Sequence, residues 1–282
     1  MEYRIKMLGL DLDGTLFNDK KEVTPRTRKA LEAAISAGVT VLVATGRPWM
    51  GVPEELRGFP GMDYALTSNG ARIIETRTGK VLEEHLISVE AAAKALEICG
   101  KYDILSEVYY DGQGYAEESK MALVEKYHKN PNMWEYMRKT RIPVDSVTRM
   151  VKREGRAMDK VQVLFADMSE RARAWEELSE EKSLELVSSL GYNIEINASG
   201  VNKGTGLVSL GRMLGIRREE IMACGDGDND IVMLREAGLG IAMANAEDQV
   251  KEAADHITRS NEEDGVAEAI EKFVLRGGND LC

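Results

Sequence analysis

The chain has 282 residues, enough for one large domain or two modest ones, and its 43% hydrophobic content can fill a substantial core. A net charge of −11 provides no general attraction to nucleic acid or anionic membranes, so neither is expected as a partner. Because the three cysteines form no CxxC pair and no apolar run approaches the roughly 20 residues of a membrane span, we expect a soluble cytoplasmic protein without a disulfide framework.

The N-terminal part of the chain predicts a βαβ unit. Ile5–Leu12 is nearly continuous apolar sequence, which is typical of a strand buried on both faces of a parallel sheet. Thr24 and the proline after it indicate the start of a helix, and Gly38 indicates its end. A second short strand follows at Thr40–Ala44. A strand, a helix and a strand in this order form a βαβ unit.

Two further parts of the chain continue this alternation. After the βαβ unit, the predicted strands are Tyr64–Thr67, Arg72–Ile74 and Lys80–Leu82. Towards the C-terminus, the predicted strands are Asn193–Ile196, Ile221–Cys224, Leu239–Ala242 and His256–Thr258, and the predicted helices are Lys203–Leu214, Asp230–Ala237, Gln249–Ala254 and Gly265–Arg276. Gly277–Cys282 is expected to form a tail. This rhythm predicts an α/β fold with a doubly wound, Rossmann-like parallel sheet.

The middle of the chain has a different pattern. Its predicted helices are Val89–Cys99, Ser119–Lys129 and Ser169–Leu178, and its predicted strands are Glu107–Tyr110, Gly114–Ala116 and Val161–Phe165. We therefore predict an inserted α+β cap domain at residues 83–190. The core domain is then made of residues 1–82 and 191–282.

Two carboxylates lie at the end of the first predicted strand, in the run Asp11–Leu16. Alternation along an extended chain places Asp11 and Asp13 on the same side, close enough to share a cation. Ligands of open α/β sheets bind at the carboxyl ends of the strands, which is where this pair lies. One aspartate can attack phosphorus while the other protonates the leaving oxygen and later activates water. The structural alternative is a turn with two solvated carboxylates.

Two shorter runs offer phosphate-binding groups. Thr45-Gly46-Arg47 combines a hydroxyl, an open backbone and a cation after the second strand, although a βα turn with a surface arginine fits this run equally well on its own. Lys203 lies in the first turn of a predicted helix, where a cation opposes the helix dipole unless an anion binds there. Taken alone, Lys203 fits a surface lysine better.

The run Gly225–Asp230 places three carboxylates between an apolar strand and a helix. Their mutual repulsion favours a cation, and hard oxygen ligands suit Mg²⁺. Asp226, at the end of the strand, is expected to be a direct metal ligand. Asn229 and Asp230 are expected to brace the site or the bound phosphate. An elaborate helix N-cap is the alternative.

In their order along the chain, these runs resemble the four motifs of the haloacid dehalogenase (HAD) superfamily phosphatases. The runs are Asp11–Leu16, Thr45-Gly46-Arg47, Lys203 and Gly225–Asp230. The long insert between the second and third motifs is similar to the α/β cap of the Cof-type branch. The run Ser68-Asn69-Gly70-Ala71 also resembles a stretch common in that branch.

The resemblance implies a role for each matching residue. Asp11 would be the nucleophile and Asp13 the acid and base, and the Mg²⁺ ligands would be Asp11, the Asp13 backbone carbonyl and Asp226. The phosphoryl group would be bound by Thr45, Gly46, Lys203 and Asn229, with Asp230 and Arg47 supporting the site. Dehalogenation is not expected, because the dehalogenases lack the second aspartate of the first motif.

The expected function is Mg²⁺-dependent hydrolysis of small phosphorylated metabolites, with sugar phosphates as the expected class and an aspartyl-phosphate intermediate. A phosphomutase of the same superfamily is the first alternative, since it would use the same motifs. A non-catalytic metabolite-binding regulator is the second, and the presence of both Asp11 and Asp13 argues against it. We expect a monomer or a small homo-oligomer.

Overall fold

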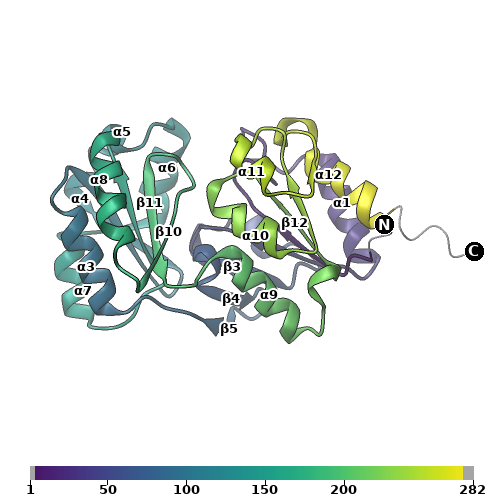
Figure 1. The fold of residues 1–282 in the computed structure, drawn as a ribbon, viewed down its shortest axis with the longest axis horizontal. Helices are drawn as coiled ribbons and strands as arrows, with labels where there is room; N and C mark the ends of the chain where they lie inside the picture. Colours follow the sequence, from purple (N-terminus) through teal and green to yellow (C-terminus); the bar gives the residue numbers. More distant parts are fainter. Residues whose placement is uncertain (1–3, 276–282) are drawn as a thin grey trace, which may run out of the picture. The chain divides into compact units, whose positions relative to one another are not determined.

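The computed structural model describes residues 4–275, which divide into two compact units (Figure 1). Within these bounds, unit 1 comprises the residues up to 46, residues 53–83 and the residues from 202 onward. Unit 2 comprises residues 47–52 and 84–201. The predicted tail Gly277–Cys282 and the last residue of the predicted closing helix, Arg276, lie outside the described residues.

Unit 1 is built on an eight-stranded sheet with the order β14-β13-β12-β1-β2-β3-β4-β5. Its strands are β1 (Met7–Leu10), β2 (Thr40–Ala44), β3 (Tyr64–Thr67), β4 (Arg72–Glu75), β5 (Lys80–Glu84), β12 (Ile221–Gly225), β13 (Leu239–Ala242) and β14 (His256–Ile257). From β14 to β3 all neighbours are parallel, and β4 pairs antiparallel with β3. All four residues of β1 are buried in the middle of this sheet. The predicted doubly wound core is thereby confirmed.

Helices cover the sheet of unit 1. They are α1 (Pro25–Ser36), α2 (Glu54–Arg57), α9 (Lys203–Met213), α10 (Ile231–Glu236), α11 (Asp248–Glu252) and α12 (Gly265–Ile270). Thr24 caps α1 by accepting a hydrogen bond from the Thr27 N–H, as its sequence indicates. α9 and α10 bury Leu207, Leu210 and Met233 in one apolar cluster with the central strands. α1 and α12 contact one another (Figure 1). The predicted closing helix is shorter than expected, because α12 gives way to a π-helical turn at Glu271–Leu275.

The register of the central strands brings three strand ends together. Leu10 of β1 pairs with Val43 of β2 on one side and with Cys224 of β12 on the other. The backbone N–H of Asp11 continues this pattern by donating to the Cys224 carbonyl at 3.0 Å. The residues that follow these strands therefore meet at one edge of the sheet, as expected for ligand sites in parallel sheets.

Unit 2 is built on a six-stranded sheet with the order β10-β11-β9-β6-β7-β8. The strands are β6 (Ile104–Tyr110), β7 (Gln113–Glu117), β8 (Arg141–Val144), β9 (Lys160–Phe165), β10 (Leu184–Val187) and β11 (Asn193–Ala198). The helices are α3 (Val89–Cys99), α4 (Glu118–Met121), α5 (Val124–Tyr127), α6 (Pro131–Thr140), α7 (Val147–Glu154) and α8 (Met168–Ser179). Side chains from α3, α7 and α8 share an apolar cluster with the sheet. This additional α+β sheet unit agrees with the predicted fold class.

Several details of the middle of the chain differ from the prediction. β11 pairs with β9 and β10, so residues 193–196 belong to unit 2 and the chain returns to unit 1 at 202 rather than 191. The helix predicted at Ser119–Lys129 is two short helices, α4 and α5, separated by Ala122 and Leu123. Helices α6 and α7 and strands β8 and β10 were not predicted. Among residues 4–275, no helix combines the length and the apolar character that crossing a bilayer requires.

Candidate active site

Asp11 is the first residue after β1 and lies in a buried polar cluster of unit 1. Its side chain is 10% exposed, and its Oδ1 accepts a hydrogen bond from the Lys203 ammonium at 2.6 Å. Within residues 4–275, no hydrogen-bond donor contacts Oδ2 of Asp11. The carboxylate is thus held through one oxygen, while the other remains available for chemistry.

Lys203 is the first residue of α9, and its side chain is fully buried between two carboxylates. The Lys203 Nζ lies 2.6 Å from Asp11 Oδ1 and 2.7 Å from Asp230 Oδ1. Burial by itself would lower the pKa of Lys203, but attraction to Asp11 and Asp230 outweighs it, so this pKa is raised. Lys203 therefore carries its positive charge inside the cluster.

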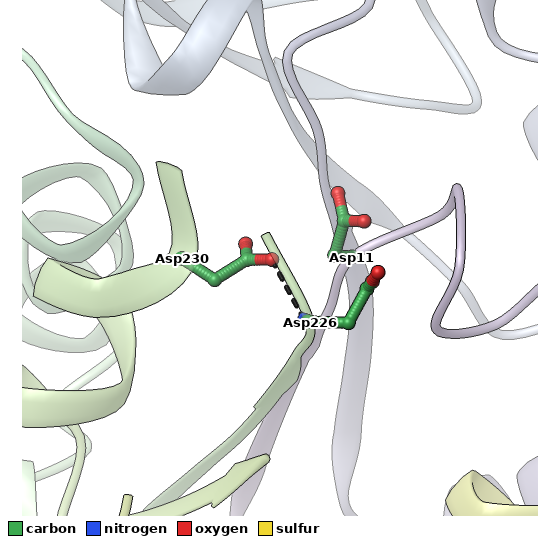
Figure 2. Close-up of side chains that lie close together, drawn as sticks. All are labelled: Asp11, Asp226 and Asp230. Atoms are coloured by element: carbon green, nitrogen blue, oxygen red, sulfur yellow. Dashed lines mark hydrogen bonds between the residues drawn. The ribbon is translucent and has the colours of Figure 1, made fainter. Parts of the chain in front are cut away.

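Figure 2 shows how Asp226 and Asp230 approach Asp11. Each of these three residues offers a carboxylate oxygen, and these oxygens lie within 4.8 Å of one another. Oδ2 of Asp230 accepts hydrogen bonds from the backbone N–H groups of Asp226 and Gly227, each at 3.0 Å, while its Oδ1 accepts from Lys203. Oδ1 of Asp226 accepts from the Thr15 hydroxyl at 2.6 Å. The sheet thus gathers side chains from three distant segments, as predicted.

The electrostatics of this cluster favour an added cation. Burial raises the pKa of Asp11, and the charges of Asp230 and Asp226 raise it further against the opposing effect of Lys203. Burial, with the charge of Asp230, raises the pKa of Asp226 to about 7. Three carboxylates share a single buried lysine, so ionising all of them leaves uncompensated negative charge. An all-oxygen donor set of this kind fits Mg²⁺.

Gly14 lets the first loop pass close to this cluster. Its φ angle is +87°, in the left-handed region, and a Cβ atom there would lie 2.2 Å from Asp226 Oδ2. The Gly14 carbonyl accepts a hydrogen bond from the Asn245 side chain at 2.9 Å. Any larger residue would be strained in this conformation and would also displace the Asp226 carboxylate.

Asp13 lies two residues beyond Asp11 and is paired with a lysine. Its Oδ1 lies 2.8 Å from the Nζ of Lys21, and the two side chains are 34% and 32% exposed. The turn that carries Lys21 is closed by hydrogen bonds from the Lys21 N–H to the Asn18 carbonyl and from the Glu22 N–H to the Asn18 side chain, each at 2.9 Å. A defined turn therefore presents a cation to the second aspartate.

The second motif divides between the two units. Thr45 follows β2 and is buried, and its backbone donates to the Leu66 carbonyl and accepts from the Asn69 N–H, each at 3.0 Å. Gly46 is the last residue of this segment of unit 1, whereas Arg47 belongs to unit 2. The Arg47 guanidinium donates to the Gly51 carbonyl at 3.0 Å and lies 4.6 Å from the centroid of the Tyr136 ring. Support of the Asp11 cluster by Arg47 therefore stays a prediction.

The fourth motif forms a 3₁₀ turn, Asp228–Asp230, before α10. Asn229 in this turn is buried, and its Nδ2 donates to Oδ1 of Asn69 at 3.2 Å. Asp228 is exposed instead and accepts a hydrogen bond from Gln249 at 2.6 Å. Asn229 and Asp230 are thus buried while Asp228 is exposed, and the roles expected of Asn229 and Asp230 stay predictions.

Four residues with contacts in this region were given no role from the sequence. They are Thr15, Lys21, Asn69 and Asn245. Thr15 lies inside the first motif and Asn69 inside the Ser68–Ala71 run, so the sequence pointed to both positions. Lys21 and Asn245 reach Asp13 and Gly14 only through the folding of surface loops, which no local pattern indicates.

Comparison with known proteins identifies the family. The sequence profile of the haloacid dehalogenase-like hydrolases matches residues 8–270, which includes all four motifs. The chain belongs to this family. The resemblance seen in the motifs is thereby confirmed.

Several phosphatases of this family are similar to the chain over almost their full length. The chain is 33% identical over 277 residues to the 5-amino-6-(5-phospho-D-ribitylamino)uracil phosphatase YcsE of Bacillus subtilis, with 96% of each chain covered. It is 27% identical to the pyridoxal phosphate phosphatase YbhA of Escherichia coli, covering 94% of this chain and 97% of that protein.

Solved structures agree with both the fold and the class of enzyme. A haloacid dehalogenase-like hydrolase from B. subtilis superimposes with a TM-score of 0.86 at 27% identity, covering 96% of this chain and 100% of the other. A sugar phosphatase of HAD subclass IIB superimposes with a TM-score of 0.80 at 25% identity, covering 95% and 98%. This HAD hydrolase is accordingly a phosphoric monoester hydrolase.

Proposed function

We propose that this HAD hydrolase is a Mg²⁺-dependent phosphatase that cleaves small phosphorylated metabolites through an aspartyl-phosphate on Asp11. The observation that carries this proposal is the state of the Asp11 carboxylate. It lies at the end of β1, with Oδ1 held by Lys203 and with no hydrogen-bond donor from residues 4–275 on Oδ2. An oriented carboxylate with one open oxygen is suited to nucleophilic attack.

The reaction then follows from the residues around Asp11. Its Oδ2 attacks phosphorus, and the bond from phosphorus to the leaving oxygen breaks as Asp13 gives that oxygen a proton. Asp13 next removes a proton from a water molecule, which attacks the phosphorus, releases inorganic phosphate and restores the Asp11 carboxylate. Lys203 and Asn229, together with Thr45 and Gly46, hold the phosphoryl oxygens through the transition state.

The expected Mg²⁺ ligands are the Asp11 and Asp226 carboxylates and the Asp13 backbone carbonyl. When bound, the ion offsets the repulsion between the Asp11 carboxylate and the phosphate and stabilises charge in the transition state. Asp230 suits a supporting role, because both of its oxygens already accept hydrogen bonds from Lys203 and from the backbone of Asp226 and Gly227.

The substrate is proposed to be a small sugar or sugar-alcohol phosphate. The names of two similar proteins support this class, since one is a phosphatase of a phospho-D-ribitylamino compound and the other a sugar phosphatase. A third, a pyridoxal phosphate phosphatase, supports a small phosphorylated metabolite more generally. Unit 2 is proposed to act as the cap domain that selects among such substrates. We also propose that the enzyme acts in the cytoplasm as a monomer or a small homo-oligomer.

The first test compares wild type with Asp11→Asn on a panel of sugar phosphates and p-nitrophenyl phosphate, with Mg²⁺ or with EDTA. We expect turnover only with Mg²⁺ and only in wild type, and an acid-quenched, hydroxylamine-sensitive phosphoenzyme in wild type during turnover of labelled substrate. Asp228→Asn is the matched control, because this exposed carboxylate of the same motif contacts Gln249 outside the cluster. Turnover by Asp11→Asn contradicts the proposal, and return of phosphate to the substrate instead of its release identifies a phosphomutase.

A further inference from the structure

The turn Ser68–Gly70, which directly follows β3, has an unusual backbone. Its three residues have φ angles of 51°, 61° and 92°, so all of them lie in the left-handed region. Ser68 and Asn69 are buried, at 0% and 1% exposure. Asparagine enters this region more readily than most residues, but a buried serine there is uncommon, and such backbone outliers gather at functional sites. The residues that contact this turn therefore indicate which part of the site it supports.

These contacts reach three segments of the candidate site. The Asn69 N–H donates to the carbonyl of Thr45 at 3.0 Å. The Asn69 side chain accepts from Nδ2 of Asn229 through its Oδ1 at 3.2 Å. Gly70 packs so closely that a Cβ atom there would lie 2.5 Å from the carbonyl of Asn202, the residue that caps the helix beginning with Lys203. One turn thus touches the second, third and fourth motifs.

We infer that Asn69 is a positioning residue that orients Asn229 and Thr45 for the transferring phosphoryl group. This role rests on the proposed function, which assigns Asn229 and Thr45 to that group. The Asn229 amide has two N–H bonds, and donating one to Asn69 fixes the plane of the amide and the direction of the other. A donor oriented before the substrate arrives needs no reorganisation in the transition state.

A purely structural role for the turn predicts different effects of substitution on stability and on kcat/KM. If Asn69 served only to pack the core, its loss would lower stability and would affect activity equally with or without the Asn229 amide. If Asn69 acts through Asn229, the two substitutions are coupled, and their effects on kcat/KM are not additive. A double-mutant cycle with a separate stability measurement distinguishes these cases.

The variant for this cycle is Asn69→Gly. Glycine adopts the left-handed region without strain and keeps the N–H that binds Thr45, so the substitution removes the side chain that accepts from Asn229 and leaves this backbone contact in place. With Mg²⁺ and the best sugar phosphate of the panel, we expect Asn69→Gly to lower kcat/KM about tenfold in wild type but less than about twofold in an Asn229→Ala background. The thermal unfolding temperature should stay close to that of wild type.

Two results overturn this role for Asn69. One is an equal loss of kcat/KM in both backgrounds, and the other is no loss in wild type. If Asn69→Gly does not fold, Asn69→Ser takes its place in the cycle, because Ser68 shows that serine occupies the left-handed region in this turn. Mg²⁺-dependent turnover that Asp11→Asn abolishes tests the proposed function separately, so an additive cycle in an active enzyme contradicts only the role of Asn69.

Discussion

Asp226 gives the candidate site a dependence on pH near neutrality. Burial and the neighbouring Asp230 charge raise its pKa from 3.8 to about 7. Between these two values the folded chain holds a proton that the unfolded chain has lost, so the metal-free protein loses stability as the pH rises through this window. A bound cation favours the ionised carboxylate, so the stabilisation that it provides grows as the pH rises.

We therefore expect the stabilisation by Mg²⁺ to grow with pH. In EDTA, the unfolding temperature of unit 1, which contains Asp226, should fall between about pH 5 and pH 7, and the increase produced by Mg²⁺ should become larger over the same range. Asp226→Asn has no titrating carboxylate at this position and should weaken both trends, while the raised pKa of Asp11, which burial causes first, keeps a part of them. Scanning fluorimetry at a series of pH values measures them, and a Mg²⁺ effect in Asp226→Asn as large as in wild type argues against this ligand.

Lys21 allows the role of Asp13 to be tested without altering Asp13 itself. Removing the ammonium that lies 2.8 Å from the Asp13 carboxylate should leave this carboxylate less well placed to protonate a leaving group. For Lys21→Met we expect kcat/KM to fall about tenfold with an alkyl phosphate and less than about twofold with p-nitrophenyl phosphate, whose leaving group needs no proton.

Lys20→Met is the matched control for this comparison, since Lys20 is the exposed neighbour on the same turn. It removes the same charge from the loop and should leave both substrates unaffected. A similar loss with both substrates in Lys21→Met would show that the ion pair supports the loop rather than the proton transfer.

At the level of helices and strands, the parallel sheet of unit 1 was predictable because its central strands are short, apolar and buried on both faces. The ends of β1, β2 and β12 were therefore located to within a residue or two, and with them Asp11, Thr45 and Asp226. Since parallel pairing aligns these ends, local sequence also determined that the motifs meet. Side-chain partners such as Lys21 depend on loop conformation and were not predictable in this way.

The misassignment of β11 has a physical explanation. Asn193, Glu195 and Asn197 alternate with Ile194 and Ile196, so polar side chains line one face of the strand and apolar side chains the other. Such alternation is typical of antiparallel strands rather than of parallel strands between two layers of helices. In β11 the polar face is also buried, where Glu195 pairs with Lys160. The pattern was present in the sequence, but the strands and helices that follow this segment continue the α/β alternation, which favoured unit 1.

Gly14 provides a prediction for the loop that follows β1. Gly14→Ala places a methyl group 2.2 Å from the Asp226 carboxylate in a left-handed conformation, so it should lower kcat/KM by about 100-fold and stability by about 1–2 kcal/mol.

Gly38→Ala separates these two effects. Gly38 has a similar φ of +84° with no atom within 4 Å of its absent Cβ, so this substitution should cost comparable stability with no loss of activity. Steady-state kinetics and chemical unfolding of both variants give the comparison. If Gly14→Ala were as active as Gly38→Ala, close approach to Asp226 would not matter for catalysis.

At the scale of the whole molecule, the two units have separate apolar cores, so their stabilities can respond to different conditions. The candidate metal ligands lie in unit 1, whereas unit 2 contains a buried histidine. The Nδ1 of His128 lies 2.7 Å from the Tyr192 hydroxyl, and the residue is 1% exposed. Burial lowers the pKa of His128 from 6.5 to about 4.

We expect unit 2 to lose stability in mild acid because of His128. The unfolded chain takes up a proton below about pH 6.5 that the folded unit binds only near pH 4, so stability falls between these values by up to about 3 kcal/mol. His128→Gln should be less stable at neutral pH and should lack this part of the pH dependence. Urea unfolding followed by tryptophan fluorescence provides the measurement, since the Trp134 ring nitrogen donates to the His128 carbonyl at 2.6 Å. An unchanged slope in His128→Gln would assign the acid sensitivity to other groups.

The chain enters unit 2 twice, and this affects how chimeras of related enzymes can be designed. Besides the long insert, unit 2 includes residues 47–52, where the Met50 N–H donates to the Gly112 carbonyl at 3.0 Å and a Cβ on Gly112 would lie 2.8 Å from the Trp49 Cβ. A chimera that takes only residues 84–201 from a relative would pack the host's Trp49 against the relative's β6–β7 hairpin. Transplanting both segments together keeps such contacts native, so an exchange of unit 2 between relatives requires two pieces of sequence rather than one.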